Sequence, residues 1–179
     1  MDAEQLRELQ APIKARYREQ PQAAEVTLRA TSRLGEGLSC RVETGQALVE
    51  AGLHPASGGS GLQACSGDML LQALAACAGV TLSAVATALG IALRDATLRA
   101  EGRLDFRGTL GVDKTVPVGL QDVRLHIDVD TDASDEQLDT LLRLTERYCV
   151  VLQTLARAPR LSASIDRRQT TIRGGDDGR

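Results

Sequence analysis

The chain has 179 residues, of which 42% are apolar, and this is enough for one domain with a hydrophobic core. A formal net charge of −3 and only three aromatic residues, Tyr17, Phe106 and Tyr148, argue against a nucleic-acid partner. The N-terminus lacks the basic and apolar regions of a secretory signal, and the most apolar stretch, residues 69–93, is interrupted by polar side chains. We therefore expect a cytoplasmic protein without a membrane span.

The first part of the chain predicts a helix followed by a hairpin. Residues 2–19 are rich in helix formers, with apolar side chains about one turn apart, and Pro21 stops the pattern. Residues 25–32 and 38–43 alternate between apolar and polar side chains on either side of a glycine-containing turn at 35–37. We expect a short amphipathic helix and then two antiparallel strands.

A long apolar helix is expected after a flexible loop. The loop, residues 55–61, is rich in Gly and Ser and shows no periodicity. Residues 67–89 consist mainly of Ala and Leu, and Gly90 stands where a helix C-cap is expected. The apolar side chains recur at helical spacing and include Cys77, so the thiol of this residue is expected to face the core.

The second half of the chain predicts another hairpin and another amphipathic helix. Residues 91–104 and 123–130 alternate as strands do. The sequence Ser134-Asp-Glu-Gln137 matches a capping box, and apolar side chains at helical spacing predict one helix that ends near Pro159. Cys149 lies on the apolar face of this helix and is also expected to point into the core.

The C-terminal part completes a single domain. Residues 161–165 predict a last strand, and the polar, Gly-rich residues 167–179 predict a disordered tail. The chain thus divides into a helical lead-in at 1–22, one domain at 23–166 and the tail, without an internal repeat.

Two cysteine-containing motifs resemble those of a known family. The run Ser66-Gly-Asp-Met-Leu-Leu-Gln-Ala-Leu-Ala-Ala-Cys77 resembles the P-x-E-L-L-L-x-A-L-A-A-C helix of the OsmC/Ohr family, the osmotically inducible protein C and organic hydroperoxide resistance proteins. Tyr148-Cys149-Val-Val resembles the family's second motif, x-C-P-V, and the whole resemblance covers residues 24–166. The chain departs from these motifs because Asp68 replaces Glu, Ser66 replaces the first Pro, and Val150 replaces the second.

The resemblance implies an α+β fold in an intertwined homodimer, with two antiparallel-sheet halves around central cysteine-bearing helices. It also implies a thiol-dependent peroxidase that reduces organic hydroperoxides in oxidative-stress defence. Cys77 would be the peroxidatic thiol, and Cys149 would resolve its sulfenic acid to a disulfide. The family further implies a small dithiol or a lipoyl group as the reductant, and no cofactor is expected.

A buried thiol needs a nearby stabilising group to ionise, because desolvation raises its pKa above about 8.5. The N-terminus of the predicted helix is too distant from Cys77 to help, so a cation is expected beside this thiol. In the family an Arg has this role and is oriented by a carboxylate near the start of the cysteine helix. The resemblance assigns the cation to Arg33 in the first hairpin turn, with Arg29 and Arg41 as alternates, and the carboxylate to Asp68. Asp68 could equally complement the dipole of its own helix.

Other interpretations remain open. Each motif cysteine could be a core residue, since free Cys packs as a small apolar side chain. The chain could also be a non-catalytic dimer that binds a small hydrophobic ligand or senses redox state through Cys77. Cys40 and Cys65 lie outside both motifs and are interpreted as incidental. The spacing of the four cysteines and of His54 and His126 does not match a structural zinc site, so no metal is expected.

Overall fold

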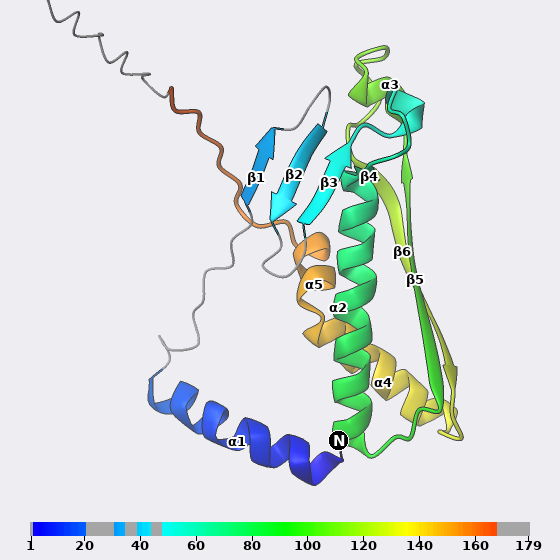
Figure 1. Cartoon of the computed structure of the whole chain (residues 1–179). Coiled ribbons are helices and arrows are strands. Elements are labelled where there is room, and N and C mark those ends of the chain that lie inside the picture. Colours follow the sequence, from blue (N-terminus) through cyan, green and yellow to red (C-terminus); the bar gives the residue numbers. More distant parts are fainter. Residues whose placement is uncertain (1, 21–30, 35–38, 44–47, 168–179) are drawn as a thin grey trace, which may run out of the picture.

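One long helix organises the molecule (Figure 1). In this helix, α2 (Ser66–Leu89), the Ala- and Leu-rich sequence forms six to seven turns, and α4, α5 and β5 pack along it. The computed structural model describes residues 2–20, 31–34, 39–43 and 48–167. The other elements, in chain order, are α1 (Ala3–Glu19), β1 (Thr31–Leu34), β2 (Ser39–Glu43), β3 (Leu48–Gly52), a short 3-10 helix (Pro55–Ser57), β4 (Ala64–Cys65), β5 (Asp95–Leu104), α3 (Phe106–Thr109), β6 (Leu120–Asp130), α4 (Asp135–Tyr148) and α5 (Val150–Ala156).

The N-terminal strands form a four-stranded sheet in the order β1-β2-β3-β4. β1 pairs antiparallel with β2, which confirms the expected hairpin, although residues 25–30 of its first strand lie outside the described residues. β3 pairs antiparallel with β2 and parallel with β4. The sequence pattern does not predict β3 and β4, because β4 is very short and β3 contains Ala51 and Gly52, which have low strand propensity.

The predicted central helix is confirmed as α2. Its buried side chains recur every four residues, which places one stripe against the core; they are Leu74, Ala78, Leu82 and Ala86. Gly90 ends the helix with a left-handed backbone (φ 69°) that glycine adopts without a steric penalty. α2 is long and apolar enough to cross a membrane by length and composition alone. In the single chain, only 22% of its most apolar 18-residue segment is buried.

The second expected hairpin is confirmed as β5 and β6. The two strands pair antiparallel from Asp95 opposite Asp130 to Leu104 opposite Leu120, with an irregularity between Glu101 and Arg103. Every second side chain of β5 is partly buried. Because strand side chains alternate between faces, this inner row packs against α2 while the charged outer row faces solvent.

The predicted single helix from Ser134 to Pro159 is wrong, because the chain forms two helices that meet at Cys149. The capping box at the start of α4 is confirmed: the Gln137 N–H donates to Ser134 Oγ at 3.3 Å, and the Ser134 N–H donates to Gln137 Oε1 at 2.9 Å. At Cys149 the backbone becomes extended (φ −71°, ψ 105°) and then enters α5. The apolar period continues across this break, so the pattern alone did not reveal it.

The predicted strand at residues 161–165 is also wrong. This segment forms no strand in the structure, and the side chains of Leu161 and Ile165 are 88% and 98% exposed. An alternating pattern produces a strand only where a neighbouring strand accepts its hydrogen bonds. Most of the predicted tail, residues 168–179, lies outside the described residues.

The core consists of two clusters along α2. The cluster toward the C-terminal end of α2 has four buried residues, Leu82, Ala86, Ile91 and Leu141. The cluster nearer its N-terminal end has three, Leu74, Ala78 and Cys149. This second cluster brings α2 into contact with the junction between α4 and α5, and it forms the candidate active site.

Candidate active site

Cys77 and Cys149 lie together in the second cluster, although they are 72 positions apart in the sequence. Cys149 is completely buried beside Leu74 and Ala78 of α2. Cys77 packs against this buried group from the edge of the α2 stripe and is only half-buried. The fold thus creates a thiol pair in which one sulfur is partly accessible and the other is enclosed.

The break at Cys149 determines which backbone groups reach the thiols. The Cys149 N–H donates to the carbonyl oxygen of Thr145 at 2.9 Å and completes α4, while the Cys149 carbonyl accepts the N–H of Gln153 at 2.9 Å in α5. The first N–H groups of a helix have no partner within that helix. In α5, no side chain caps these groups, and the N–H groups of Val150 and Val151 interact with the Cys77 thiol.

These contacts change the acidity of Cys77. Burial raises the pKa of the Cys77 thiol, but the N–H of Val151, the Cys149 thiol, the N–H of Val150 and the Thr81 hydroxyl all act in the opposite direction. Together they hold the pKa of Cys77 below its usual value. The backbone at the start of α5 therefore supplies part of the stabilisation that the sequence analysis assigned to a cation.

The pKa of the second thiol shifts in the opposite direction. Burial raises the pKa of Cys149, and the neighbouring Cys77 raises it further. The N–H groups of Leu152 and Val151 lower it, but their effect is smaller. Cys77 therefore ionises at a lower pH than Cys149. The thiolate is the reactive form of cysteine, so these directions favour Cys77 as the thiol that reacts first.

Two threonines beside the cysteines were missed by the sequence analysis. The Thr81 hydroxyl donates to the carbonyl oxygen of Cys77 at 2.8 Å, and Thr145 lies one turn before Cys149 with its side chain fully buried. Each threonine stands four positions from a motif cysteine, so each shares a helix face with that cysteine. This spacing is visible in the sequence and is a signal that could have identified them.

The structure does not bring Asp68 to Cys77 within one chain. Asp68 is exposed in the first turn of α2, nine positions before Cys77, which is about 14 Å along the helix axis. Within the described part of the chain, no ion pair to Asp68 is found. Its position near the start of the helix is favourable for a carboxylate in any case, because the helix dipole is positive there.

Arg33 lies within a strand and not in the hairpin turn, which corrects the expected location. It occupies β1 directly opposite Arg41 of β2. The side chains of both residues, and the whole of Arg29, lie outside what the structure describes. The assignment of Arg33 as the activating cation remains a prediction from the resemblance.

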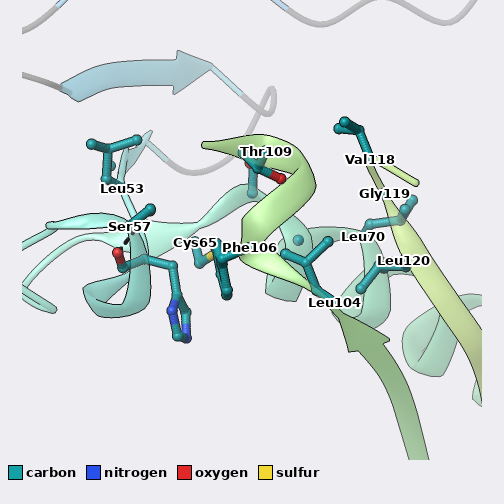
Figure 2. A pocket seen from close by; sticks show the side chains of 14 residues that line it. Leu53, Ser57, Cys65, Leu70, Leu104, Phe106, Thr109, Val118, Gly119 and Leu120 are labelled. Carbon is teal, nitrogen blue, oxygen red and sulfur yellow. Dashed lines mark hydrogen bonds between the residues drawn. The ribbon is translucent and has the colours of Figure 1, made fainter. Parts of the chain in front are cut away.

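A separate cavity of about 360 Å³ lies at the start of α2 (Figure 2). Its wall is mostly apolar, and Figure 2 shows Leu70, Leu104 and Leu120 gathered on one side with Phe106 and Cys65 beside them. The ring of His54 stacks on Phe106 at a centroid distance of 5.0 Å. Neither Cys77 nor Cys149 lines this cavity, so it is distinct from the thiol pair.

The remaining candidate ligands are dispersed. The Nδ1 atom of His54 accepts the N–H of Ala56 at 3.0 Å, and Nε2 of His126 lies 3.1 Å from a carboxylate oxygen of Asp128. Among residues 2–20, 31–34, 39–43 and 48–167, no three His, Cys, Asp or Glu side chains come together as a metal site. Cys40 lies on β2, and its side chain is outside the described part of the structure.

Comparison with known proteins places this geometry in a family. No curated protein matches the chain. Three similar solved structures are an OsmC-like protein from Mycoplasma pneumoniae, an organic hydroperoxide resistance protein from Elizabethkingia anophelis, and an organic hydroperoxide resistance protein OsmC from Legionella pneumophila. They are 20%, 19% and 19% identical, with TM-scores of 0.63, 0.60 and 0.58. The matches cover 75%, 75% and 74% of this chain and 90%, 91% and 90% of the others, which shows a shared α+β fold. The family model of the OsmC-like protein matches residues 59–164, more than half of the sequence, and the chain therefore belongs to the OsmC-like family.

Proposed function

We propose that this protein is a thiol-dependent peroxidase that reduces organic hydroperoxides in cytoplasmic defence against oxidative stress. Cys77 is the peroxidatic thiol and Cys149 is the resolving thiol. The proposal is carried by one observation: the two thiols lie together, with the pKa of Cys77 lowered despite its burial and that of Cys149 raised by burial. The solved structures named as organic hydroperoxide resistance proteins favour the same class of substrate.

The reaction has two oxidative steps. The Cys77 thiolate attacks the terminal oxygen of a hydroperoxide ROOH, an S–O bond forms as the O–O bond breaks, and RO⁻ takes up a proton and leaves as an alcohol. The Cys149 thiolate then attacks the sulfur of the Cys77 sulfenic acid. The S–S bond forms as the S–O bond breaks, and hydroxide leaves and becomes water. A small dithiol, such as the reduced dihydro form of a lipoyl group, then reduces the protein disulfide by two thiol exchanges and is itself oxidised to a disulfide.

The surroundings of the thiol pair favour a peroxide with an organic group. Apolar, partly buried side chains from β5, β6 and α5 pack around the pair; they are Leu98, Ala100, Leu125, Val151 and Leu152. A site lined in this way gains free energy from an alkyl or lipid chain that hydrogen peroxide lacks. The selectivity for organic hydroperoxides is therefore expected to come from apolar contacts.

We further propose that the active form is a homodimer. In the single chain α2 exposes much of its apolar surface; Val80, for example, is 74% exposed. Exposed apolar surface of this extent on one helix favours a partner surface that removes it from water. A second copy of the chain, packed against this face of α2, would bury it.

The proposed function is tested by mass measurement and thiol counting on the reduced protein, before and after one equivalent of an organic hydroperoxide such as cumene hydroperoxide. We expect the rapid loss of two thiols, and peptide mapping should locate them as a disulfide between Cys77 and Cys149. Slow oxidation that begins at Cys40 or Cys65 would contradict the proposal.

The cavity at the start of α2 supports a second candidate function, the binding of a small hydrophobic ligand without catalysis. Its volume of about 360 Å³ lies within the range of small-molecule sites, and its wall is mostly apolar. A binder would take up an apolar fluorescent probe and would keep this property in Cys77→Ser, without consuming hydroperoxide. A peroxidase would lose all turnover in the same variant.

A further inference from the structure

Thr145 on α4 has a hydroxyl group whose environment needs an explanation. The residue is 0% exposed, and its Oγ1 atom has no hydrogen-bond partner among the described residues. A buried hydroxyl without a partner destabilises the state in which it occurs, so native proteins satisfy nearly all such groups. The group is therefore expected to find its partner in another state of the protein.

Three other helical threonines of this chain satisfy their hydroxyls locally. Thr81, Thr87 and Thr154 each donate to the carbonyl oxygen four residues earlier, at 2.8 Å. The Thr145 hydroxyl does not make the corresponding bond to Leu141. Because helical threonine divides between two χ1 rotamers, Thr145 can direct its hydroxyl away from its own backbone without strain.

The position of Thr145 points to Cys149 as the partner. Leu141, Thr145 and Cys149 follow one another at four-residue spacing and are all buried. The hydrogen bond of 2.9 Å from the Cys149 N–H to the Thr145 carbonyl shows that the helical geometry continues between them. Side chains of a helix lean toward its N-terminus, so this spacing favours an approach of the Cys149 side chain to Thr145.

The Cys149 sulfur needs a donor only when it is ionised. Apolar side chains from α2, β5, β6 and α5 pack around it, and Cys77 is the titratable group that acts on it. The N–H groups of Leu152 and Val151 also lower the pKa of its thiol, but burial outweighs them. In the reduced protein burial keeps Cys149 protonated, because burial raises the pKa of its thiol. To attack oxidised Cys77, the same sulfur must become a thiolate in apolar surroundings.

We propose that Thr145 donates its hydroxyl hydrogen to the Cys149 sulfur when this sulfur is a thiolate. A change of the Thr145 rotamer, which is fast compared with disulfide chemistry, would direct the hydroxyl at the negative charge. The role of this contact in turnover rests on the proposed function, whereas the contact itself can be tested without peroxide.

The first experiment isolates Cys149 in the background Cys40→Ser, Cys65→Ser, Cys77→Ala and follows its thiolate absorbance against pH. Thr145→Val keeps the shape of the side chain and removes the donor, so we expect the pKa of Cys149 to rise by about one unit, or tenfold less thiolate. Thr145→Ser retains the donor and should keep the original pKa. Thr87→Val removes a hydroxyl that is bonded to its own helix and should leave the titration unchanged.

The second experiment follows disulfide formation in the full chain after one equivalent of cumene hydroperoxide. In Thr145→Val the rate of disulfide formation should fall about tenfold near neutral pH and return toward the parent rate as the pH rises. In Thr145→Ser the rate should equal that of the parent. A loss of packing alone would lower the unfolding temperature but would not move this pH profile. If the valine variant does not fold, Thr145→Ala removes the same donor.

The outcomes separate the two proposals. Equal Cys149 pKa values in the parent and in Thr145→Val would overturn the donor role, whether or not the disulfide forms. A raised pKa in Thr145→Val, in a protein that never forms the disulfide, would support the donor contact and reject the proposed peroxidase.

Discussion

The thiols of Cys77 and Cys149 lie together, yet the pKa of Cys77 is lowered and that of Cys149 is raised. The difference has a structural origin. Burial opposes ionisation of both sulfurs, but the N–H groups of Val151 and Val150 act on Cys77, whereas the nearby Cys77 itself further opposes ionisation of Cys149. The N–H groups at the start of α5 therefore act on both sulfurs, but only the pKa of Cys77 is lowered.

The first prediction concerns the pH dependence of thiol reactivity. A lowered pKa keeps a thiol ionised to lower pH. The reaction of Cys77 with iodoacetamide should therefore reach its half-maximal rate at a pH below about 8.5, the usual thiol pKa. Cys149 should react only above that value, since burial raises its pKa. Peptide mapping after alkylation at several pH values measures both rates.

The matched control is the protein unfolded in urea, in which both thiols should titrate near the ordinary value. An order of reactivity with Cys149 ahead of Cys77 in the folded protein would contradict the assignment of the nucleophile.

The second prediction separates the roles of the two cysteines. Cys77→Ser should abolish hydroperoxide consumption, because it removes the attacking sulfur. Cys149→Ser should consume one equivalent and stop, with a sulfenic acid on Cys77 that a sulfenic-acid reagent such as dimedone traps. Cys65→Ser, which alters a thiol in the separate cavity, should keep dithiol-driven turnover. Full cycling by Cys149→Ser would show that Cys149 is not the resolving thiol.

Local signals in the sequence predicted the elements that position the site. The Ala- and Leu-rich run ending at Gly90, the Ser134 capping box and the alternation of β5 with β6 each depend on neighbouring residues, so they could be identified without tertiary contacts. The family motifs, in turn, pointed to two cysteines that the fold brings into one cluster.

Features that depend on distant contacts could not be predicted. The break at Cys149 leaves the apolar period intact, so only the packing of α5 reveals the N–H groups that face Cys77. The alternation at residues 161–165 suggested a strand, but a strand requires a partner that the sequence does not specify. Two β-branched residues directly after Cys149, Val150 and Val151, were a weak local sign of the break.

The third prediction concerns the exposed face of α2. If a second copy covers this face, Val80→Asp places a charge in the interface and should convert the dimer to a monomer with unchanged helix content. Leu110→Asp provides the control, since Leu110 is an exposed apolar residue in the loop after α3 and is 54% exposed. Sedimentation velocity measures the oligomeric state of each variant. A parent protein that sediments as a monomer would remove the basis for the proposed dimer.

The fourth prediction tests the backbone contribution at the start of α5. Val150 is the first residue of this helix, where proline is tolerated, and the extended backbone of Cys149 suits a residue that precedes proline. Val150→Pro should therefore fold, with a free energy of unfolding raised by about 0.4–1 kcal/mol through the smaller entropy of the unfolded chain. It also removes an N–H that acts on Cys77, so the pKa of Cys77 should rise toward its usual value. Val150→Ala retains this N–H and replaces an exposed side chain, so it should leave the Cys77 titration unchanged. Thiolate absorbance measures the Cys77 pKa of both variants, and chemical unfolding measures their free energy of unfolding. An identical Cys77 pKa in Val150→Pro and Val150→Ala would show that the N–H of residue 150 does not stabilise the thiolate.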